Sequence, residues 1–347
     1  MKKLSKLMAV VLAVAMVLAL AACGSTGGAA SGSAAPAASG SGAASGSGSA
    51  APAGDGQTYK IGICQLVQHE ALDAANQGFQ DALTEKLGDA VKFDDQNASG
   101  DSANCSTIVN GFVSDGDDLI LAIATSPLQA AAAATADIPV LGTAVTDYAT
   151  ALEISDWSGT VGTNVSGTSD LAPLDQQADM LHDLFPDAKN VGLLYCSAEP
   201  NSVYQCTVIE GYLKELGYNV TWYAFNDTND VTSVTETAAD NSDVIYIPTD
   251  NTAASNNEAI ANVLVPAGVP AICGEEGICK GCGVATLSIS YYDLGVTTGK
   301  MAAKILTGEA DISEMPIEFT EATPKYNASM CETLGIEPLE GYTAIEE

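Results

Sequence analysis

The stretch Leu119-Ile120-Leu121-Ala122-Ile123-Ala124 has six apolar residues in succession and indicates the fold class more clearly than any other segment. A strand with one face in water alternates apolar and polar side chains, and this stretch has no polar position. Its length suits a strand of about 4–8 residues and is short for a helix. The stretch is therefore typical of a strand in a parallel sheet covered by helices on both faces.

Further short apolar runs alternate with helical patterns along the chain. Residues 72–87 place Leu72, Phe79 and Leu83 on one face of a helix. The other expected helices are 129–135, 203–216 and 231–239. The other expected strands are 59–64, 138–142, 191–195, 219–223, 244–248 and 269–273. Two such series of alternating elements predict an α/β fold with two doubly wound parallel-sheet lobes.

The N-terminal residues have the features of an export signal followed by a linker. Three lysines precede an apolar run over residues 7–20, which is short for a membrane span of about 20 residues. The run ends in Leu20-Ala21-Ala22-Cys23, which resembles the bacterial lipobox. We expect residues 1–22 to be a signal peptide and Cys23 to be lipidated; the alternative is an ordinary signal peptide with an incidental cysteine. Residues 23–57 are rich in Gly, Ala, Ser and Pro and predict a flexible linker.

The body that begins at residue 58 is long enough for two domains of about 100–200 residues each. The expected lobes are residues 58–165 plus 288–316 for lobe 1 and residues 166–287 plus 317–347 for lobe 2. We expect the chain to cross between them near residues 162–167 and 287–289.

The charge is strongly unbalanced and excludes several partners. Without the three lysines of the signal, nine lysines face 44 carboxylates, and the sequence contains no arginine. A nucleic-acid-binding surface needs a basic patch, and a bidentate clamp on phosphate needs a guanidinium group. Both are therefore excluded. The acidic excess itself is interpreted as a general bias of exported proteins rather than as a binding feature.

The cysteines leave several interpretations open. Eight remain after Cys23, at irregular spacing, so no disulfide framework follows from them. Cys279-Lys280-Gly281-Cys282 lies in a segment that its glycines predict to be a loop. Its thiols are interpreted as plain loop thiols, with a local disulfide, a metal site or redox chemistry as alternatives. A metal site would need more ligands, and the only histidines are His69 and His182, so we expect no metal and no cofactor.

The loops that follow the expected strands are the place to look for function. In open parallel sheets the ligand binds beyond the carboxyl ends of the strands. These loops are residues 65–69, 125–127, 143–147, 197–202, 249–252 and 274–277. They are rich in hydroxyl, amide and carboxylate groups, and they contain no Ser/His/Asp or Cys/His set and no Walker-type loop. Catalysis is not indicated, and we expect that the protein is not an enzyme.

A series of short motifs occurs in these loops and strands, in order along the whole body. They are Ile61-Gly62-Ile63, His69-Glu70-Ala71-Leu72-Asp73, Ala122-Ile123-Ala124-Thr125, Thr143-Ala144-Val145-Thr146-Asp147, Gly167-Thr168-Ser169-Asp170, Leu194-Tyr195, Pro248-Thr249-Asp250-Asn251-Thr252, Glu275-Glu276-Gly277 and Tyr291-Tyr292-Asp293-Leu294-Gly295. Together they resemble the tryptophan/tyrosine-type substrate-binding proteins of ABC transporters.

The resemblance implies the type I periplasmic-binding-protein fold, with two lobes joined by a three-strand hinge and closing on a ligand between them. It also implies an amino acid ligand, aromatic in type, that is delivered to a membrane permease and its ATPase. The sequence departs from the family pattern in two places. Glu70 replaces the usual proline after the first-loop histidine, and Ser126-Pro127-Leu128 replaces the commoner Pro-Ala-Ala. Both places face the expected cleft, which puts the exact ligand in doubt.

A zwitterionic amino acid needs acceptors for its ammonium group and donors for its carboxylate. The candidate ligand-binding residues are Gln65, His69, Thr125, Ser126, Thr143, Asp147, Ser169, Asp170, Asn201, Asn251 and Glu275. Without arginine, hydroxyl groups such as those of Thr125, Ser126 and Thr143, and N–H groups at helix N-termini, must hold the carboxylate. The ammonium acceptors are Asp147, Asp170 or Glu275. The structural alternatives are helix N-caps for Thr125, Ser126 and Asp170 and a turn position for Asn251.

Two further alternatives remain from the sequence. One is a sugar-binding or sensory receptor of the same fold, which the missing arginine disfavours; the other is an exported thiol enzyme that uses Cys279 and Cys282. The leading hypothesis is a monomeric receptor, anchored by lipid at the extracytoplasmic face of the cell membrane. Aromatic side chains that can line its cleft are Tyr148, Trp157, Tyr204 and Tyr292.

Overall fold

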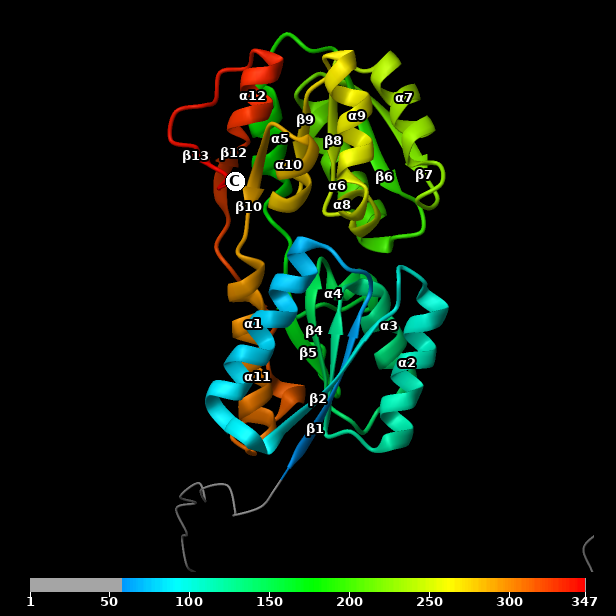
Figure 1. Ribbon diagram of the computed structural model, residues 1–347, viewed down its shortest axis with the longest axis vertical. Coiled ribbons are helices and arrows are strands. Elements are labelled where there is room, and N and C mark those ends of the chain that lie inside the picture. The colour runs from blue at the N-terminus through cyan, green and yellow to red at the C-terminus, as the bar shows by residue number, and fades with distance from the viewer. Residues whose placement is uncertain (1–57, 347) are drawn as a thin grey trace, which may run out of the picture. The chain divides into compact units, whose positions relative to one another are not determined.

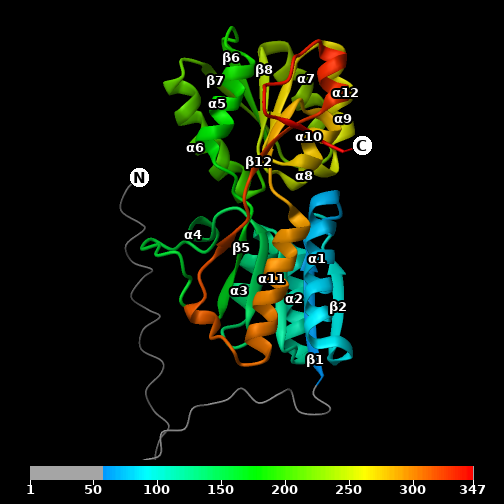
Figure 2. The same cartoon turned by 90° about the vertical axis from the view of Figure 1, so that its left-hand side faces the viewer.

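The computed structural model describes residues 58–346, which form two α/β lobes (Figures 1 and 2). The expected signal peptide, the lipidation site Cys23 and the linker lie outside the described residues. The first lobe contains a six-stranded sheet of order β11-β5-β4-β3-β1-β2, in which all pairs are parallel. Its strands are β1 (Tyr59–Gln65), β2 (Val91–Asn97), β3 (Leu119–Ile123), β4 (Val140–Val145), β5 (Val165–Ser169) and β11 (Glu318–Phe319).

The second lobe contains a seven-stranded sheet of order β13-β12-β10-β9-β8-β6-β7. Its strands are β6 (Asn190–Cys196), β7 (Asn219–Phe225), β8 (Val244–Ile247), β9 (Ala271–Cys273), β10 (Ala285–Ser288), β12 (Thr323–Tyr326) and β13 (Thr343–Ala344). All pairs are parallel except β10 with β12. The predicted class, two parallel-sheet α/β lobes, is confirmed.

Helices cover both faces of each sheet, as the apolar strands require. In the first lobe, α1 and α11 lie on one face and α2 and α3 on the other (Figure 1). The helices of this lobe are α1 (Glu70–Leu87), α2 (Ser102–Asp115), α3 (Thr125–Ala134), α4 (Tyr148–Ala151) and α11 (Tyr291–Leu306), with 3-10 turns at Gly88–Ala90 and Ile312–Glu314. Those of the second lobe are α5 (Leu174–Leu184), α6 (Pro200–Glu215), α7 (Val231–Asn241), α8 (Asn251–Ser255), α9 (Asn257–Ala267), α10 (Glu276–Cys282) and α12 (Ala328–Leu334). None of the described helices is both long and apolar enough to cross a membrane.

Each sheet has a fully buried central strand that matches an apolar run of the sequence. Every residue of β3 and of β8 is buried. The strand β2, by contrast, has the sequence VKFDDQN and was not expected, because it is an edge strand whose polar side chains face water. The glycine-rich segment around the CxxC sequence, expected to be a loop, contains α10. This expectation was wrong because the Glu275 side chain caps the helix by accepting from the N–H groups of Gly277 and Ile278.

The chain crosses between the lobes three times, after β5, after β10 and after β11. The first and last crossings lie a few residues beyond the expected boundaries at 165 and 316. Pairing explains the shift, since β5 is hydrogen-bonded to β4 and β11 to β5, which places both strands in the first sheet.

Helices α1 and α11 approach each other so closely that their interface has no room for a side chain at two positions. A Cβ atom on Gly295 would lie 2.0 Å from the carbonyl oxygen of Ala75, and one on Gly78 would lie 2.1 Å from that of Tyr292. Both helices begin at the end of the lobe that faces the second lobe. Their spacing therefore fixes the residues at their N-termini relative to each other.

Candidate functional site

A small cavity lies beyond the carboxyl ends of the strands, with walls from both lobes. Its empty volume of about 270 Å³ includes space open to solvent, and a water-sized sphere can occupy only about 10 Å³ of it, far less than in ligand pockets of about 300–1,000 Å³. We call it the inner cavity. Its lining residues are His69, Leu72, Ala144, Thr146, Asp170, Asn201, Thr249, Asp250, Asn251, Ala254, Glu275 and Tyr291. Three carboxylates and no lysine belong to this set, so the cavity favours a ligand that carries a positive charge.

Two of these carboxylates are fully engaged with backbone groups of the second lobe. The side chain of Asp250 accepts from the N–H of Ala253 at 2.7 Å and from that of Cys196 at 2.6 Å. The two oxygens of Glu275 accept from N–H groups in the first turn of α10. Both groups therefore have their oxygens occupied before a ligand arrives.

Asp170 differs, because one of its oxygens has no partner. It follows β5, and only 3% of its surface is exposed. Its Oδ2 accepts a hydrogen bond from the Tyr291 hydroxyl at 2.9 Å. Its Oδ1 is buried and has no hydrogen-bond partner among the described residues. An unpaired buried carboxylate oxygen costs free energy in the empty protein, and a cationic ligand group would remove that cost.

Burial raises the pKa of all three carboxyl groups. It raises the pKa of Asp170 to about 6, against the opposing effect of the hydrogen bond from Tyr291. It raises the pKa of Glu275 to about 7 despite the two N–H donors of α10. The pKa of Asp250 rises to about 8, first through burial and then through the nearby charge of Glu199. At neutral pH the cavity therefore contains buried negative charge, which costs free energy. A bound cation would reduce that cost.

The first-lobe side of the cleft presents backbone donors. Helix α3 begins directly after β3 and has no capping side chain at Ala124, so the N–H groups of Thr125 and Ser126 are available to an anion, whereas Pro127 has no N–H group. Ala124 has φ 92° and Ala144, in the inner cavity, has φ 54°. Alanine rarely adopts such angles, and strain of this kind is concentrated at functional sites.

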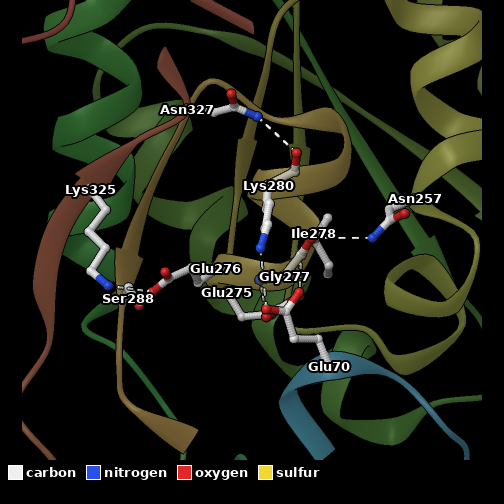
Figure 3. A network of polar contacts seen from close by, with 10 residues as sticks. All are labelled: Glu70, Asn257, Glu275, Glu276, Gly277, Ile278, Lys280, Ser288, Lys325 and Asn327. Carbon is white, nitrogen blue, oxygen red and sulfur yellow. Dashed lines mark hydrogen bonds and ion pairs between the residues drawn. The ribbon is translucent and has the colours of Figure 1, made fainter. Parts of the chain in front are cut away.

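The two lobes are linked by side-chain contacts at the cleft. His69 Nε2, in the loop before α1, lies 3.2 Å from Asn251 Oδ1, at the start of α8. Lys280 Nζ of α10 lies 3.5 Å from Glu70 Oε1 of α1, as Figure 3 shows. The first pair closes one side of the inner cavity, and the second lies at the surface.

The position of α10, and hence of Glu275, is fixed from several sides (Figure 3). Glu276 pairs with Lys325 Nζ at 2.7 Å and accepts from the Ser288 hydroxyl. Asn327 donates to the carbonyls of Cys279 and Lys280, both at 2.9 Å. Ser288 ends β10 and Lys325 lies in β12, so these bonds connect α10 to two of the segments that cross between the lobes.

Several residues expected from the sequence lie around this cleft. His69, Asp170, Asn201, Asn251 and Glu275 line the inner cavity. Ser126 lines a larger space of about 800 Å³, part of it open to solvent, which we call the outer chamber. Thr125 and Asp147 line a small adjoining pocket together with Asn201 and Tyr204. Asp147 is also the N-cap of α4.

Three expected residues are occupied elsewhere. The Gln65 amide donates to Val67 O at 3.0 Å and Asp73 Oδ1 at 2.7 Å. The hydroxyl of Thr143 is 3.1 Å from that of Thr168 inside the first lobe. The Ser169 hydroxyl donates to the Thr146 carbonyl at 2.8 Å. None of the three lines the inner cavity, because internal hydrogen bonds hold their side chains in the lobe.

The aromatic residue of the inner cavity is not one of those expected. Trp157 and Tyr292 are exposed, and Tyr148 is buried in the first lobe, where it donates to the Thr168 carbonyl. Tyr291 lines the cavity instead. The helical period of α11 distinguishes Tyr291 from Tyr292, because Tyr291 lies on the buried face of the helix with Leu294 and Thr298.

The cysteines of the described region lie in the interior. All eight are free and buried, and Cys279 and Cys282 lie in α10 rather than in a loop. Burial raises the pKa of the Cys273 thiol, and its neighbours Cys279 and Cys282 raise it further. This environment is the opposite of the exposed, electropositive one that activates a thiol. Within residues 58–346, no cluster of three or more potential ligands is arranged to hold a metal ion.

Comparison with known proteins identifies the family. Residues 60–340 match the family model for ABC transporter substrate binding proteins. The chain belongs to this family. It is 36% identical, over 266 residues, to the tyrosine-binding protein of Clostridioides difficile strain R20291, an alignment that covers 76% of each protein.

Two solved structures are similar to this substrate-binding protein over most of its length. An ABC domain from Streptococcus pneumoniae in complex with L-Trp is 33% identical, with a TM-score of 0.79, and the match covers 83% of this chain and 100% of that one. A ligand-free, open substrate-binding protein from Clostridium difficile is 36% identical, with a TM-score of 0.64, and the match covers 83% of this chain and 99% of that one.

Proposed function

We propose that this substrate-binding protein holds one free aromatic amino acid between its lobes, with the ammonium group of the ligand at the inner cavity. The observation that carries the proposal is Asp170 Oδ1, a buried carboxylate oxygen without a partner at the cavity wall. A ligand ammonium group would supply the missing donor and the missing positive charge. The names of two relatives support the class of ligand, since one is a tyrosine-binding protein and another is a complex with L-Trp.

The other parts of the ligand find suitable partners around Asp170. The N–H groups of Thr125 and Ser126 at the start of α3 suit the carboxylate, because the helix dipole favours a negative charge there; these two residues line the small adjoining pocket and the outer chamber. Leu72, Ala254 and the ring of Tyr291 provide an apolar wall for the side chain of the ligand. The polar groups fix the orientation of the amino acid, and the wall selects an apolar side chain.

We further propose that Cys23 carries a lipid anchor, that residues 24–57 tether the lobes at the extracytoplasmic face, and that a membrane permease receives the ligand. Family membership and the sequence Leu20-Ala21-Ala22-Cys23 support this arrangement. Replacement of Cys23 by serine would remove the lipid site. The expected result is release of the protein from the membrane fraction, with unchanged ligand affinity.

The ligand class is tested by thermal shift of residues 58–347 with each of the twenty amino acids and a set of sugars. A ligand at 100 times its Kd stabilises the native state by about 2.7 kcal/mol. A shift of several degrees with Tyr, Trp or Phe, and none with sugars, is the expected result. A response to sugars alone would contradict the proposal and favour a sugar receptor of the same fold.

Ligand affinity should fall in mild acid. Asp170 binds an ammonium group only when ionised, and its pKa in the empty protein is about 6. Between pH 7.5 and pH 5 the affinity for tyrosine is therefore expected to decrease about tenfold, because the ionised fraction falls to roughly a tenth at one unit below the pKa. Protonation of Glu275 and Asp250, whose pKa values are also raised, acts in the same direction.

Isothermal titration at several pH values measures this dependence. The Asp147→Asn variant is the matched control, since Asp147 lies at the cleft but caps α4 and is outside the inner cavity. It should retain the pH dependence of the wild type. An affinity that is constant from pH 7.5 to 5 in the wild type would contradict the assignment of Asp170.

A further inference from the structure

We propose that Glu199 is a positioning residue for ligand binding: it orients the Asn251 amide so that Asn251 bonds His69 of the other lobe and shuts the inner cavity. The inference rests on the proposed function, because the bond between Asn251 and His69 would close over the ligand. Glu199 lies just before α6, and only 6% of its surface is exposed. It does not line the inner cavity and acts through Asn251.

Glu199 holds the start of α8 with both of its oxygens. Its Oε2 accepts from the backbone N–H of Asn251 at 3.0 Å and from the side-chain Nδ2 of Asn251 at 2.7 Å. Its Oε1 accepts from the N–H and the hydroxyl of Thr252, both at 2.8 Å. Asn201 Nδ2 also donates to Oε2, at 3.2 Å, so five donors on three residues converge on one carboxylate.

These bonds determine which end of the Asn251 amide faces the first lobe. A carboxylate only accepts, so Nδ2 must point to Glu199, and Oδ1 remains for His69 at 3.2 Å. His69 must then donate from Nε2. Burial lowers the pKa of His69, which favours the neutral ring with its proton on that nitrogen. Glu199 thus selects both the amide orientation and the histidine tautomer.

The bond between His69 and Asn251 separates two spaces. Asn251 lines both the inner cavity and the outer chamber, whereas His69 lines only the inner cavity and Glu199 only the outer chamber. When the bond forms, the inner cavity is closed toward the outer chamber, which opens to solvent. When it breaks, the ligand can pass between them.

Capping of α8 does not by itself account for Glu199. Asp250 already caps this helix through Ala253 N. A second buried carboxylate beside it adds repulsion, which contributes to the raised pKa of Asp250. Like charges that are buried without a cation are destabilising, so a role in orienting Asn251 gives a reason for the second acid.

The test combines affinity, lobe closure and histidine state in Glu199→Gln, His69→Leu and the double variant. Glutamine has one donor and one acceptor end, so it cannot accept from all five groups, and Asn251 loses its fixed orientation. We expect each single variant to bind tyrosine about tenfold more weakly, and the double variant to be no weaker than either. Small-angle scattering should show that ligand-free Glu199→Gln is more open than the wild type.

Nitrogen NMR gives a readout that a merely structural role would not change. The chain has two histidines, so the His69 signals can be assigned in a His182→Gln background. The wild type should show the Nε2–H tautomer at His69, and Glu199→Gln should show a mixture.

Asp243→Asn is the matched control. Asp243 accepts from the N–H groups of Lys189 and Asn190 at 2.8 Å, at the start of β6 rather than at the cleft. This variant should lose stability without a change in affinity or tautomer.

Two results would overturn the proposal. One is a double variant whose loss of affinity equals the product of the two single losses, and the other is an unchanged His69 tautomer in Glu199→Gln. Scattering and NMR are carried out on the ligand-free protein, so they test the bond between Asn251 and His69 even if no amino acid binds. In that case the proposed function fails while the role of Glu199 in closure is still decided. If Glu199→Gln does not fold, His69→Leu and the His69 tautomer of the wild type decide the proposal alone, since His69 is half-buried and replaceable.

Discussion

An Asp170→Asn variant is expected to bind its amino acid at least a hundredfold more weakly than the wild type and yet to be more stable when empty. Breaking a buried charge pair costs about 3–5 kcal/mol, which corresponds to a factor of more than a hundred in affinity. The gain in stability of the empty protein also comes from the buried charge of Asp170. The charge of Asp170 is buried with one oxygen unpaired, and asparagine removes that charge while it still accepts from Tyr291.

The size and sign of the stability change follow from the pKa. The folded-state pKa of about 6 exceeds the unfolded value of about 3.9, so ionised Asp170 destabilises the native state above pH 6. The full cost is on the order of 3 kcal/mol, of which asparagine recovers a part. We expect an increase of roughly 2–5 °C in Tm at pH 7.5. The difference between variant and wild type should become small near pH 4, where the carboxyl group is protonated in the native state and about half protonated in the unfolded state.

Calorimetric scans at pH 7.5 and 4, with and without tyrosine, measure both effects. A variant that keeps wild-type affinity would show that Asp170 does not contact the ligand. A variant that is less stable than the wild type at pH 7.5 would contradict the cost assigned to the unpaired oxygen.

A Gly295→Ala substitution should destabilise the first lobe by about 3 kcal/mol or more. The added Cβ would lie 2.0 Å from Ala75 O and 3.0 Å from Ala75 Cα, which are backbone atoms of α1 and cannot rotate away. The two helices must therefore move apart. Because α1 follows His69 and α11 begins with Tyr291, the separation also displaces two residues of the inner cavity, and ligand affinity should fall as well.

Gly111→Ala is the matched control for this substitution. Gly111 lies inside α2, and a Cβ there would meet nothing within 4 Å. Alanine is favoured over glycine in a helix by about 0.5–1 kcal/mol, so this variant should be slightly more stable than the wild type. Urea unfolding followed by circular dichroism compares the two. Changes of the same sign in both variants would show that packing against α1 is not what requires glycine at position 295.

The sequence predicted the buried parts of this fold better than its edges. The apolar runs in β3 and β8 identify central strands because burial on both faces leaves no room for polar residues. Edge strands such as β2 lack that signature, and the boundaries of the lobes depend on pairings between distant segments, such as β11 with β5. Helix α10 was missed because its glycines favour a loop, and the cap from Glu275 that stabilises it is a contact of the folded chain.

The candidate site was predicted in part for a similar physical reason. The rule that ligands bind beyond strand ends located the loops, and five of the proposed residues line the inner cavity. The rule does not say which side chains turn inward, so Thr143 and Ser169 were included although internal hydrogen bonds occupy them. Glu199 was missed because its importance lies in five converging donors, which no local pattern reveals.

The burial of every described cysteine allows opening of each lobe to be timed. A thiol reagent modifies only an exposed thiolate, so its rate of uptake by the native chain measures local unfolding. Cys64 and Cys105 report on the first lobe. The second lobe contains Cys196, Cys206, Cys273, Cys279, Cys282 and Cys331. In a chain without Cys23, a first phase of two labels would mean that the first lobe opens first, and a first phase of six labels would mean that the second lobe does.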